Sequence, residues 1–182
     1  MSEIYEPAED SYLMSAVLKK KLTNLLKVNS NLKFLEMGCG SGISLQTALG
    51  SGVKIGNILG ADINNKAVKY CRDLGFKVIQ SDLFSNTKGK FDLVVFNPPY
   101  LPYDKNEPKN SRTATTGGKD GSELIVKFLK GAKNHLNNGG KIFIITSSLS
   151  KDVDFGKLEY KSKEIAAKKL FFEKLSLWEL VL

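Results

Sequence analysis

The chain has 182 residues, of which 42% are hydrophobic and 25% charged, a balance typical of a globular domain and not of a disordered or fibrous protein. The net charge of +8 would attract nucleic acid or acidic proteins, but only Arg72 and Arg112 are arginines, the residue that most often reads guanine. No aliphatic run could span a bilayer, and the two cysteines predict neither disulfides nor a metal site, so we expect an unanchored cytoplasmic protein.

Strand-like and helix-like segments alternate along the chain. Five apolar runs predict strands at residues 32–37, 55–63, 76–80, 91–96 and 141–146. Helices are expected at residues 10–26, 42–49, 64–74 and 121–136, the last with Asp120 as its N-cap. This alternation predicts a doubly wound α/β fold in which helices cover both faces of a mostly parallel sheet.

The two ends of the chain and one long loop depart from this alternation. Residues 160–169 and 174–182 predict an antiparallel strand pair at the end of the sheet, and residues 1–31 predict a helical lead-in. Residues 101–119 form a long irregular loop, expected on the substrate side because loops of this length are often functional. We expect one domain over residues 1–182.

A glycine-rich turn follows the first predicted strand. Residues 36–42 read E-x-G-x-G-x-G, in which Gly38 and Gly40 allow the backbone to pass close to a ligand. The dinucleotide fingerprint would need glycine where Ile43 stands, and the P-loop lysine is absent. The carboxylate of Glu36 beside the turn favours a ligand with a cationic amino group over a pyrophosphate.

Acidic residues follow the next two strands. Asp62 is placed where α/β folds bind the hydroxyl groups of a ribose, and Asp82 ends the third strand beside Leu83, which suits the edge and face of an adenine. A ribose, an adenine and an ammonium group without a phosphate describe S-adenosylmethionine. The pattern therefore predicts this cofactor.

A rigid turn, Asn97-Pro98-Pro99-Tyr100, follows the fourth strand at the same edge of the sheet. The two prolines fix the backbone and have no N–H group to donate. The turn is expected to present the Asn97 side-chain oxygen and the Pro98 carbonyl as acceptors beside the Tyr100 ring. This arrangement fits a planar NH2 group, whose nitrogen would be the methyl acceptor.

With these motifs the sequence resembles the HemK family of glutamine-N5 methyltransferases, and more closely its short archaeal and eukaryotic branch. The resemblance rests on residues 5–11, 35–42, 97–102 and 117–121. It implies a class I, Rossmann-like methyltransferase fold with seven strands in the order 3-2-1-4-5-7-6. It also implies roles for individual residues: a cofactor site lined by Ser11, Glu36, Gly38, Asp62, Asp82, Leu83 and Asn97, and an acceptor site formed by residues 97–100.

The acceptor implied by the resemblance is the glutamine in the Gly-Gly-Gln tip of a class-I translation release factor; lysine and nucleobase acceptors are proposed for relatives. The resemblance also implies a small zinc-binding activator subunit that pairs with the sheet's exposed edge strand. That edge is the third strand, residues 75–80, with Phe76, Val78 and Ile79 available to the partner. The alternative to a partner at this edge is a short edge strand shielded by Lys77.

Two other functions stay open at this point. An adenine-N6 or other nucleic-acid methyltransferase would grip an exocyclic amine in the same way, although the chain offers no room for a target-recognition domain. A noncatalytic cofactor-binding scaffold is the second alternative, which the intact Asn97 and Pro98 disfavour. In the favoured reaction the methyl group passes in line to nitrogen without a general base, and His135 is expected late on a helix, away from the chemistry.

Overall fold

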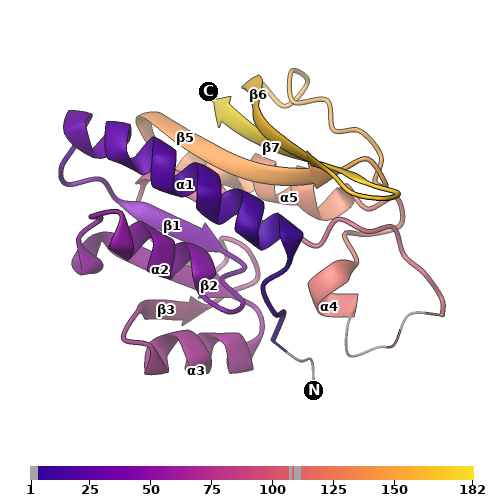
Figure 1. Ribbon diagram of the computed structural model, residues 1–182, viewed down its shortest axis with the longest axis horizontal. Helices are drawn as coiled ribbons and strands as arrows, with labels where there is room; N and C mark the ends of the chain where they lie inside the picture. The colour runs from indigo at the N-terminus through magenta and orange to yellow at the C-terminus, as the bar shows by residue number, and fades with distance from the viewer. Residues whose placement is uncertain (1–3, 107, 109–111) are drawn as a thin grey trace.

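A mixed sheet of seven strands runs through the computed structural model, which describes residues 4–106, 108 and 112–182 (Figure 1). Its strands are β1 Phe34–Met37, β2 Ile58–Asp62, β3 Lys77–Gln80, β4 Phe91–Phe96, β5 Leu136–Ser147, β6 Lys161–Lys169 and β7 Lys174–Val181. The helices are α1 Glu9–Val28, α2 Ile43–Gly50, α3 Asn65–Asp73, α4 Arg112–Thr115 and α5 Glu123–Ala132. Among these described residues, no helix is both long and apolar enough to cross a membrane.

The strand order is β3-β2-β1-β4-β5-β7-β6, which confirms the order implied by the family resemblance. The pairs formed among β1 to β5 are parallel, whereas β7 runs antiparallel to both β5 and β6. The expected antiparallel ending is therefore confirmed. Since β1 to β4 all point the same way, the turns that follow them meet at one edge of the sheet, called here the carboxyl edge.

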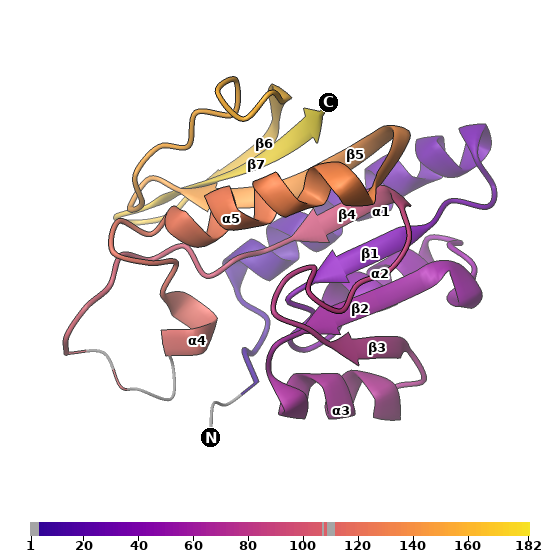
Figure 2. The same cartoon turned by 180° about the vertical axis from the view of Figure 1, so that it is seen from behind.

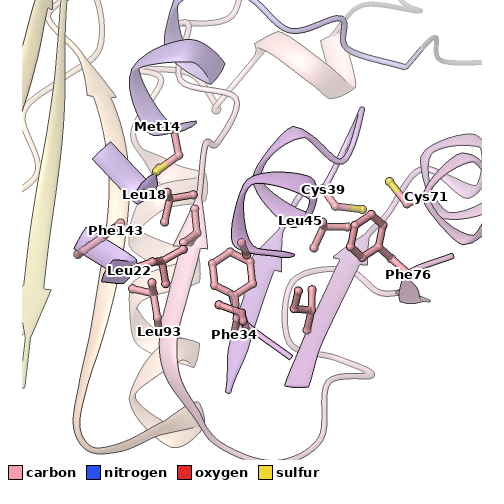
Figure 3. Packing of buried hydrophobic residues seen from close by; sticks show 14 of the residues in the cluster. Met14, Leu18, Leu22, Phe34, Cys39, Leu45, Cys71, Phe76, Leu93 and Phe143 are labelled. Carbon is pink, nitrogen blue, oxygen red and sulfur yellow. The ribbon is translucent and has the colours of Figure 1, made fainter. Parts of the chain in front are cut away.

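Helices cover both faces of the sheet, with α1, α2 and α3 on one face and α5 on the other (Figures 1 and 2). The long helix α1 packs through Met14, Leu18 and Leu22, which recur every fourth residue and so share one side of the helix. Figure 3 shows these side chains beside Leu93 of β4 and Phe143 of β5. Each such burial contributes roughly 1.5 to 3 kcal/mol, which fixes α1 over the sheet.

Several predicted boundaries are wrong for local reasons. Residues 55–57 form a 3₁₀ turn before β2, because Gly56 and Asn57 break the apolar run there. Helix α5 begins at Glu123 after Ser122, so Asp120 is not its N-cap; the Glu123 carboxylate instead accepts a hydrogen bond from the Asp120 backbone N–H at 3.0 Å. The helix ends at Ala132, and β5 already begins at Leu136, five residues before the predicted apolar run at 141–146.

The β3 edge of the sheet exposes fewer apolar side chains than expected. Strand β3 pairs only with β2, so its outer backbone groups form one edge of the sheet in the described part of the chain. Phe76 and Val78, expected to be available to a partner, are buried in the chain's own core. Of the three apolar residues expected at this edge, Ile79 is the one that stays partly accessible, whereas Lys77 and Gln80 of β3 are exposed.

The predicted loop at 101–119 contains more order than its composition suggested. Leu101 forms a bridge with Thr116, and the short helix α4 lies between them along the chain. Figures 1 and 2 both place α4 beyond the carboxyl edge of the sheet. Residues 107 and 109–111 of this predicted loop lie outside the described residues.

Candidate functional site

A cavity of about 380 Å³ opens at the carboxyl edge, a volume typical of small-molecule sites. Its wall is formed by the start of α1 and by the turns after β1, β2, β3 and β4. All the residues predicted for the cofactor or the acceptor line it: Ser11, Glu36, Gly38, Gly40, Asp62, Asp82, Leu83, Asn97, Pro98, Pro99 and Tyr100. The structure thus brings the whole predicted set together, while the role of each residue stays a prediction.

The glycine turn after β1 depends on its glycines. Gly38 and Gly42 have φ values of +63° and +73°, a region that residues with a side chain rarely adopt. A Cβ atom on Gly38 would lie 3.1 Å from the Phe96 ring, and one on Gly42 would lie 3.0 Å from the Cys71 sulfur. The backbone therefore folds tightly under the cavity, and Cys39 within the turn is buried.

Glu36 lies at the end of β1, buried beneath the turn. Its Oε2 accepts a hydrogen bond from the Leu45 backbone N–H at 2.9 Å, in the first turn of α2. Burial raises the pKa of the Glu36 carboxyl to about 8, against the opposing effect of hydrogen bonds from Ser44 and Leu45. An ammonium group entering the cavity would favour the charged carboxylate and lower this pKa again.

The raised pKa of Glu36 predicts a pH dependence of stability. Between its ordinary value of 4.5 and about 8, the unfolded chain loses the Glu36 proton while the folded chain keeps it. The free energy of unfolding should therefore fall as pH rises, by at most about 1.4 kcal/mol per pH unit from this group. Urea titrations of the ligand-free protein at pH 5, 6, 7 and 8 measure the slope. The neutral variant Glu36→Gln should lose this contribution, and an identical slope in both proteins would contradict it.

Asp62 ends β2, and its two carboxylate oxygens accept backbone N–H groups from two segments that line the cavity. Oδ2 accepts the Gly40 N–H at 2.9 Å, and Oδ1 accepts the Asn64 N–H at 2.8 Å. Burial raises the pKa of this carboxyl above its usual value, although these hydrogen bonds oppose the shift. Each carboxylate oxygen retains a further acceptor site, so Asp62 can support the turn and still bind a hydroxyl group.

Asp82 and Leu83 follow β3 in a conformation that the sequence did not reveal. The strand ends at Gln80, which confirms the end of the predicted range 76–80, and Asp82 follows two residues later. The Asp82 carboxylate is exposed and pairs with Lys127 of α5 at 2.9 Å. Leu83 has a φ of +49°, which is rare for a residue with a large side chain and commonly marks a functional site.

Asn97 lines the cavity, and its side chain carries an unsatisfied acceptor. Its Oδ1 is fully buried and has no hydrogen-bond partner in the described part of the chain, where Thr87 Oγ1 is the other such atom. Leaving a buried oxygen unpaired costs roughly 1 to 3 kcal/mol. Such a cost is expected where an incoming ligand supplies the missing donor. The observation fits the prediction that Asn97 binds an N–H group.

The buried carboxylate of Asp10 orients Tyr100 in the turn at 97–100. The sequence analysis did not identify Asp10 as part of the site. Asp10 lies in the first turn of α1 with 4% of its surface exposed, and it accepts hydrogen bonds from the hydroxyl groups of Tyr100 at 3.2 Å and Tyr5 at 3.1 Å. Its Oδ1 accepts the Ser11 N–H at 2.6 Å. Burial and then the charge of Asp10 raise the pKa of Tyr100, so its hydroxyl group stays a donor.

The segment 117–121 packs directly against the backbone of the turn at 97–100. A Cβ atom on Gly117 would lie 2.6 Å from the Pro99 carbonyl oxygen, and one on Gly121 would lie 2.4 Å from the Tyr100 carbonyl oxygen. The Gly117 N–H also donates to the Leu101 carbonyl at 2.9 Å. The two segments that sequence reasoning noted separately are therefore one packed unit.

Comparison with known proteins agrees with this geometry. The model of the methyltransferase small domain family matches residues 15–171. A Methanocaldococcus jannaschii protein, provisionally named a protein N5-glutamine methyltransferase, is 40% identical over 156 residues, which cover 81% of this chain and 74% of that protein. The eRF1 methyltransferase catalytic subunit of Schizosaccharomyces pombe is 27% identical over 176 residues, covering 82% and 74%.

Among solved structures, TrmN from Thermus thermophilus superimposes with a TM-score of 0.61 at 16% sequence identity, covering 90% of this chain and 48% of that one. At this identity the likeness shows the shared fold alone. The match to the family model over most of the sequence, together with the 40% identical relative, goes further. The chain belongs to the methyltransferase small domain family, in agreement with the HemK-like motifs at its carboxyl edge.

Proposed function

We propose that this chain transfers the methyl group of S-adenosylmethionine to the side-chain amide nitrogen of a glutamine, in the Gly-Gly-Gln tip of a class-I translation release factor. The names of the two relatives support the reaction and the class of acceptor. The observation that carries the proposal for this chain is the buried, unpaired Oδ1 of Asn97 at the cavity. A release factor acts in the cytoplasm, which is the location that we propose for this enzyme.

The cavity suits the cofactor in size and in chemistry. Gly38 and Gly40 would bring the backbone close to its amino-acid portion, with Ser11 and the Glu36 carboxyl near the ammonium group. Asp62 would bind the ribose, and Asp82 and Leu83 would border the adenine. Bound S-adenosylmethionine supplies an electrophilic methyl group on a positively charged sulfur.

The turn after β4 would hold the acceptor. An amide nitrogen is a weak nucleophile because its lone pair is delocalised, so orientation must provide much of the rate, up to roughly 7 to 11 kcal/mol in favourable cases. Asn97 Oδ1 and the Pro98 carbonyl would accept the two N–H groups and stabilise the positive charge that develops on nitrogen. Tyr100, fixed by Asp10, would pack on the face of the amide.

No general base is needed in this scheme. His135, the single histidine, stacks on Phe84 at 4.6 Å between ring centroids and hydrogen bonds through Nδ1 with the Gly89 carbonyl. It lies in a short 3₁₀ turn after α5 and does not line the cavity. The proton released from the methylated nitrogen would pass to water.

The direct test offers the purified chain several acceptors with labelled cofactor. These are a Gly-Gly-Gln release factor, the same protein with the glutamine replaced by alanine, a lysine-rich protein, RNA and DNA. Label should appear in the first protein and not in its alanine variant. Label in the nucleic acids would favour the adenine-N6 alternative, and label in no acceptor despite cofactor binding would favour a scaffold.

Replacing Asp62 tests the cofactor site. Asp62→Ala should weaken binding of S-adenosylmethionine by about 1.5 to 3 kcal/mol, the scale of a hydrogen bond to a charged group, as measured by calorimetry. Asp92→Ala is the matched control, since Asp92 also accepts a backbone N–H, from Lys33 at 2.7 Å, but lies at the start of β4 away from the cavity. Equal affinities of the two variants would remove Asp62 from the site.

The proposal extends to a small zinc-binding activator subunit at the edge of β3. The S. pombe relative is named a catalytic subunit, which supports a partner. Because Phe76 and Val78 are buried, backbone pairing along β3 would carry the contact. We expect the isolated chain to be weakly active and co-expression with such a subunit to raise activity at least tenfold. Full activity of a monodisperse single chain would contradict this.

A further inference from the structure

Two aromatic side chains at the turn between β6 and β7 stand in solvent. Phe171 and Phe172 are 92% and 85% exposed, and their rings meet edge to face with centroids 4.7 Å apart. The Leu170 N–H donates to the Glu173 carbonyl at 2.7 Å, which closes the turn, and Leu170 packs against the core. Hairpin turns favour Gly, Asn and Asp, so the two rings serve neither the turn nor the core.

This hairpin tip, residues 170–173, lies at the carboxyl edge of the sheet. Strand β7 starts opposite the end of β5, where Ser147 pairs with Leu175. The Ser147 hydroxyl group donates to the Glu173 carboxylate at 2.5 Å, and Lys168 of β6 pairs with Glu9 at the start of α1. Figures 1 and 2 both show the tip at the same end of the molecule as the start of α1 and helix α4.

The tip is also close to the acceptor side of the cavity. Tyr100, which lines the cavity, and Leu170 pack against the same hydrophobic cluster. After burial and Asp10, the Glu173 charge is the next cause that raises the pKa of Tyr100, as expected for a nearby anion. A polypeptide whose side chain reaches the turn at 97–100 could therefore contact the tip as well.

We propose that the Phe171–Phe172 tip is a docking site for the protein that carries the methyl acceptor, an inference that rests on the proposed function. Exposed aromatic residues that project from a rigid element are common anchors in protein interfaces, where they fill pockets of the partner. The expected partner surface is an apolar pocket close to the acceptor loop. Acidic residues around it would match the exposed Lys169 beside the tip and the chain's net charge of +8.

The charges near the tip favour a protein over a nucleic acid. Lys168 is paired with Glu9, Lys174 is paired with Glu164, and the Glu173 carboxylate lies within the turn itself. Binding of a phosphate backbone draws its affinity from unpaired basic side chains that release counterions. Two of the three lysines that flank the turn are already paired with carboxylates. Apolar contact by the two rings is therefore expected to contribute more to binding than contacts with phosphate groups.

The test separates docking from chemistry. The double variant Phe171→Ser/Phe172→Ser is compared with wild type on two acceptors, an intact Gly-Gly-Gln release factor and a short peptide with the same tripeptide. We expect KM for the intact protein to rise at least tenfold, with kcat within twofold and cofactor affinity unchanged. Kinetics on the peptide should be unaltered, because a short peptide cannot reach the tip. The control is Val28→Ser, which removes an apolar side chain that is 89% exposed at the other end of α1.

Each remaining outcome overturns the inference. An unchanged KM for the intact protein removes the docking site, and an equal loss on protein and peptide shows damage to the cavity instead. Loss of RNA retention on filters in the double variant, with KM for the protein unchanged, would assign the tip to nucleic acid. The proposed function and the docking site can also be refuted separately. A wild-type chain that leaves the release factor unlabelled refutes both the proposed function and this docking partner. Normal labelling of the release factor by the double variant refutes the docking site alone.

Discussion

Asn97→Ala should lower turnover by roughly 10² to 10³, the effect of removing one preorganised polar group that acts mainly in the transition state. Cofactor affinity should change by less than about tenfold, because most of the proposed cofactor contacts come from Glu36, Gly38 and Asp62. Stability should stay level or rise, since the substitution removes a buried oxygen that lacks a hydrogen-bond partner. Turnover, calorimetric affinity and melting temperature, measured on one preparation, test all three expectations.

Thr87→Val provides the matched control for this experiment. Thr87 Oγ1 is likewise buried without a partner in the described chain, but Thr87 does not line the cavity. Replacing it with a side chain of similar shape should leave both turnover and affinity unchanged. If Asn97→Ala instead melts earlier and methylates at the wild-type rate, Asn97 only closes a turn and the acceptor site lies elsewhere.

Sequence patterns predicted most of the architecture because each pattern has a simple physical cause. Continuous apolar runs such as residues 91–96 can only be buried between two layers of helices, and a glycine turn at a strand end requires left-handed backbone, as Gly38 and Gly42 show. The boundaries were less predictable. Residues 137–140, Asn-Asn-Gly-Gly, have the composition of a turn, yet pairing between Leu136 and Phe91 draws them into β5.

The sequence predicted which residues would line the cavity, but it did not predict the hydrogen bonds that those residues make. Glu36 and Asp62 were expected to face a ligand, whereas each also accepts backbone N–H groups that hold the glycine turn and the helices beside it. Asp10 was missed because its partner Tyr100 is 90 residues away along the chain, and a contact at that distance leaves no periodic signal. Leu83 lines the cavity, but its left-handed φ depends on the surrounding packing, which the sequence pattern does not show.

The structure also shows close packing against the turn at 97–100, which we propose holds the acceptor. Gly117 and Gly121 allow the segment 117–121 to approach the carbonyl groups of Pro99 and Tyr100 more closely than any side chain would permit. The Tyr100 hydroxyl group of the same turn also donates a hydrogen bond to Asp10. Orientation is the main help available for methylation of an amide, so the packing on both sides of the turn should matter for rate.

Gly121→Ala should therefore lower turnover by about 10², because the new methyl group would lie 2.4 Å from the Tyr100 carbonyl oxygen and must displace the acceptor turn. The φ of Gly121 is +83°, so part of any loss of stability will come from backbone strain, roughly 1 kcal/mol. Gly89→Ala isolates that part: Gly89 has a φ of +89°, and a Cβ atom there would meet nothing within 4 Å. We expect both variants to melt earlier and only Gly121→Ala to lose turnover, with cofactor affinity within tenfold of wild type. Equal turnover in the two variants would show that strain alone acts and that the segment 117–121 does not position the acceptor.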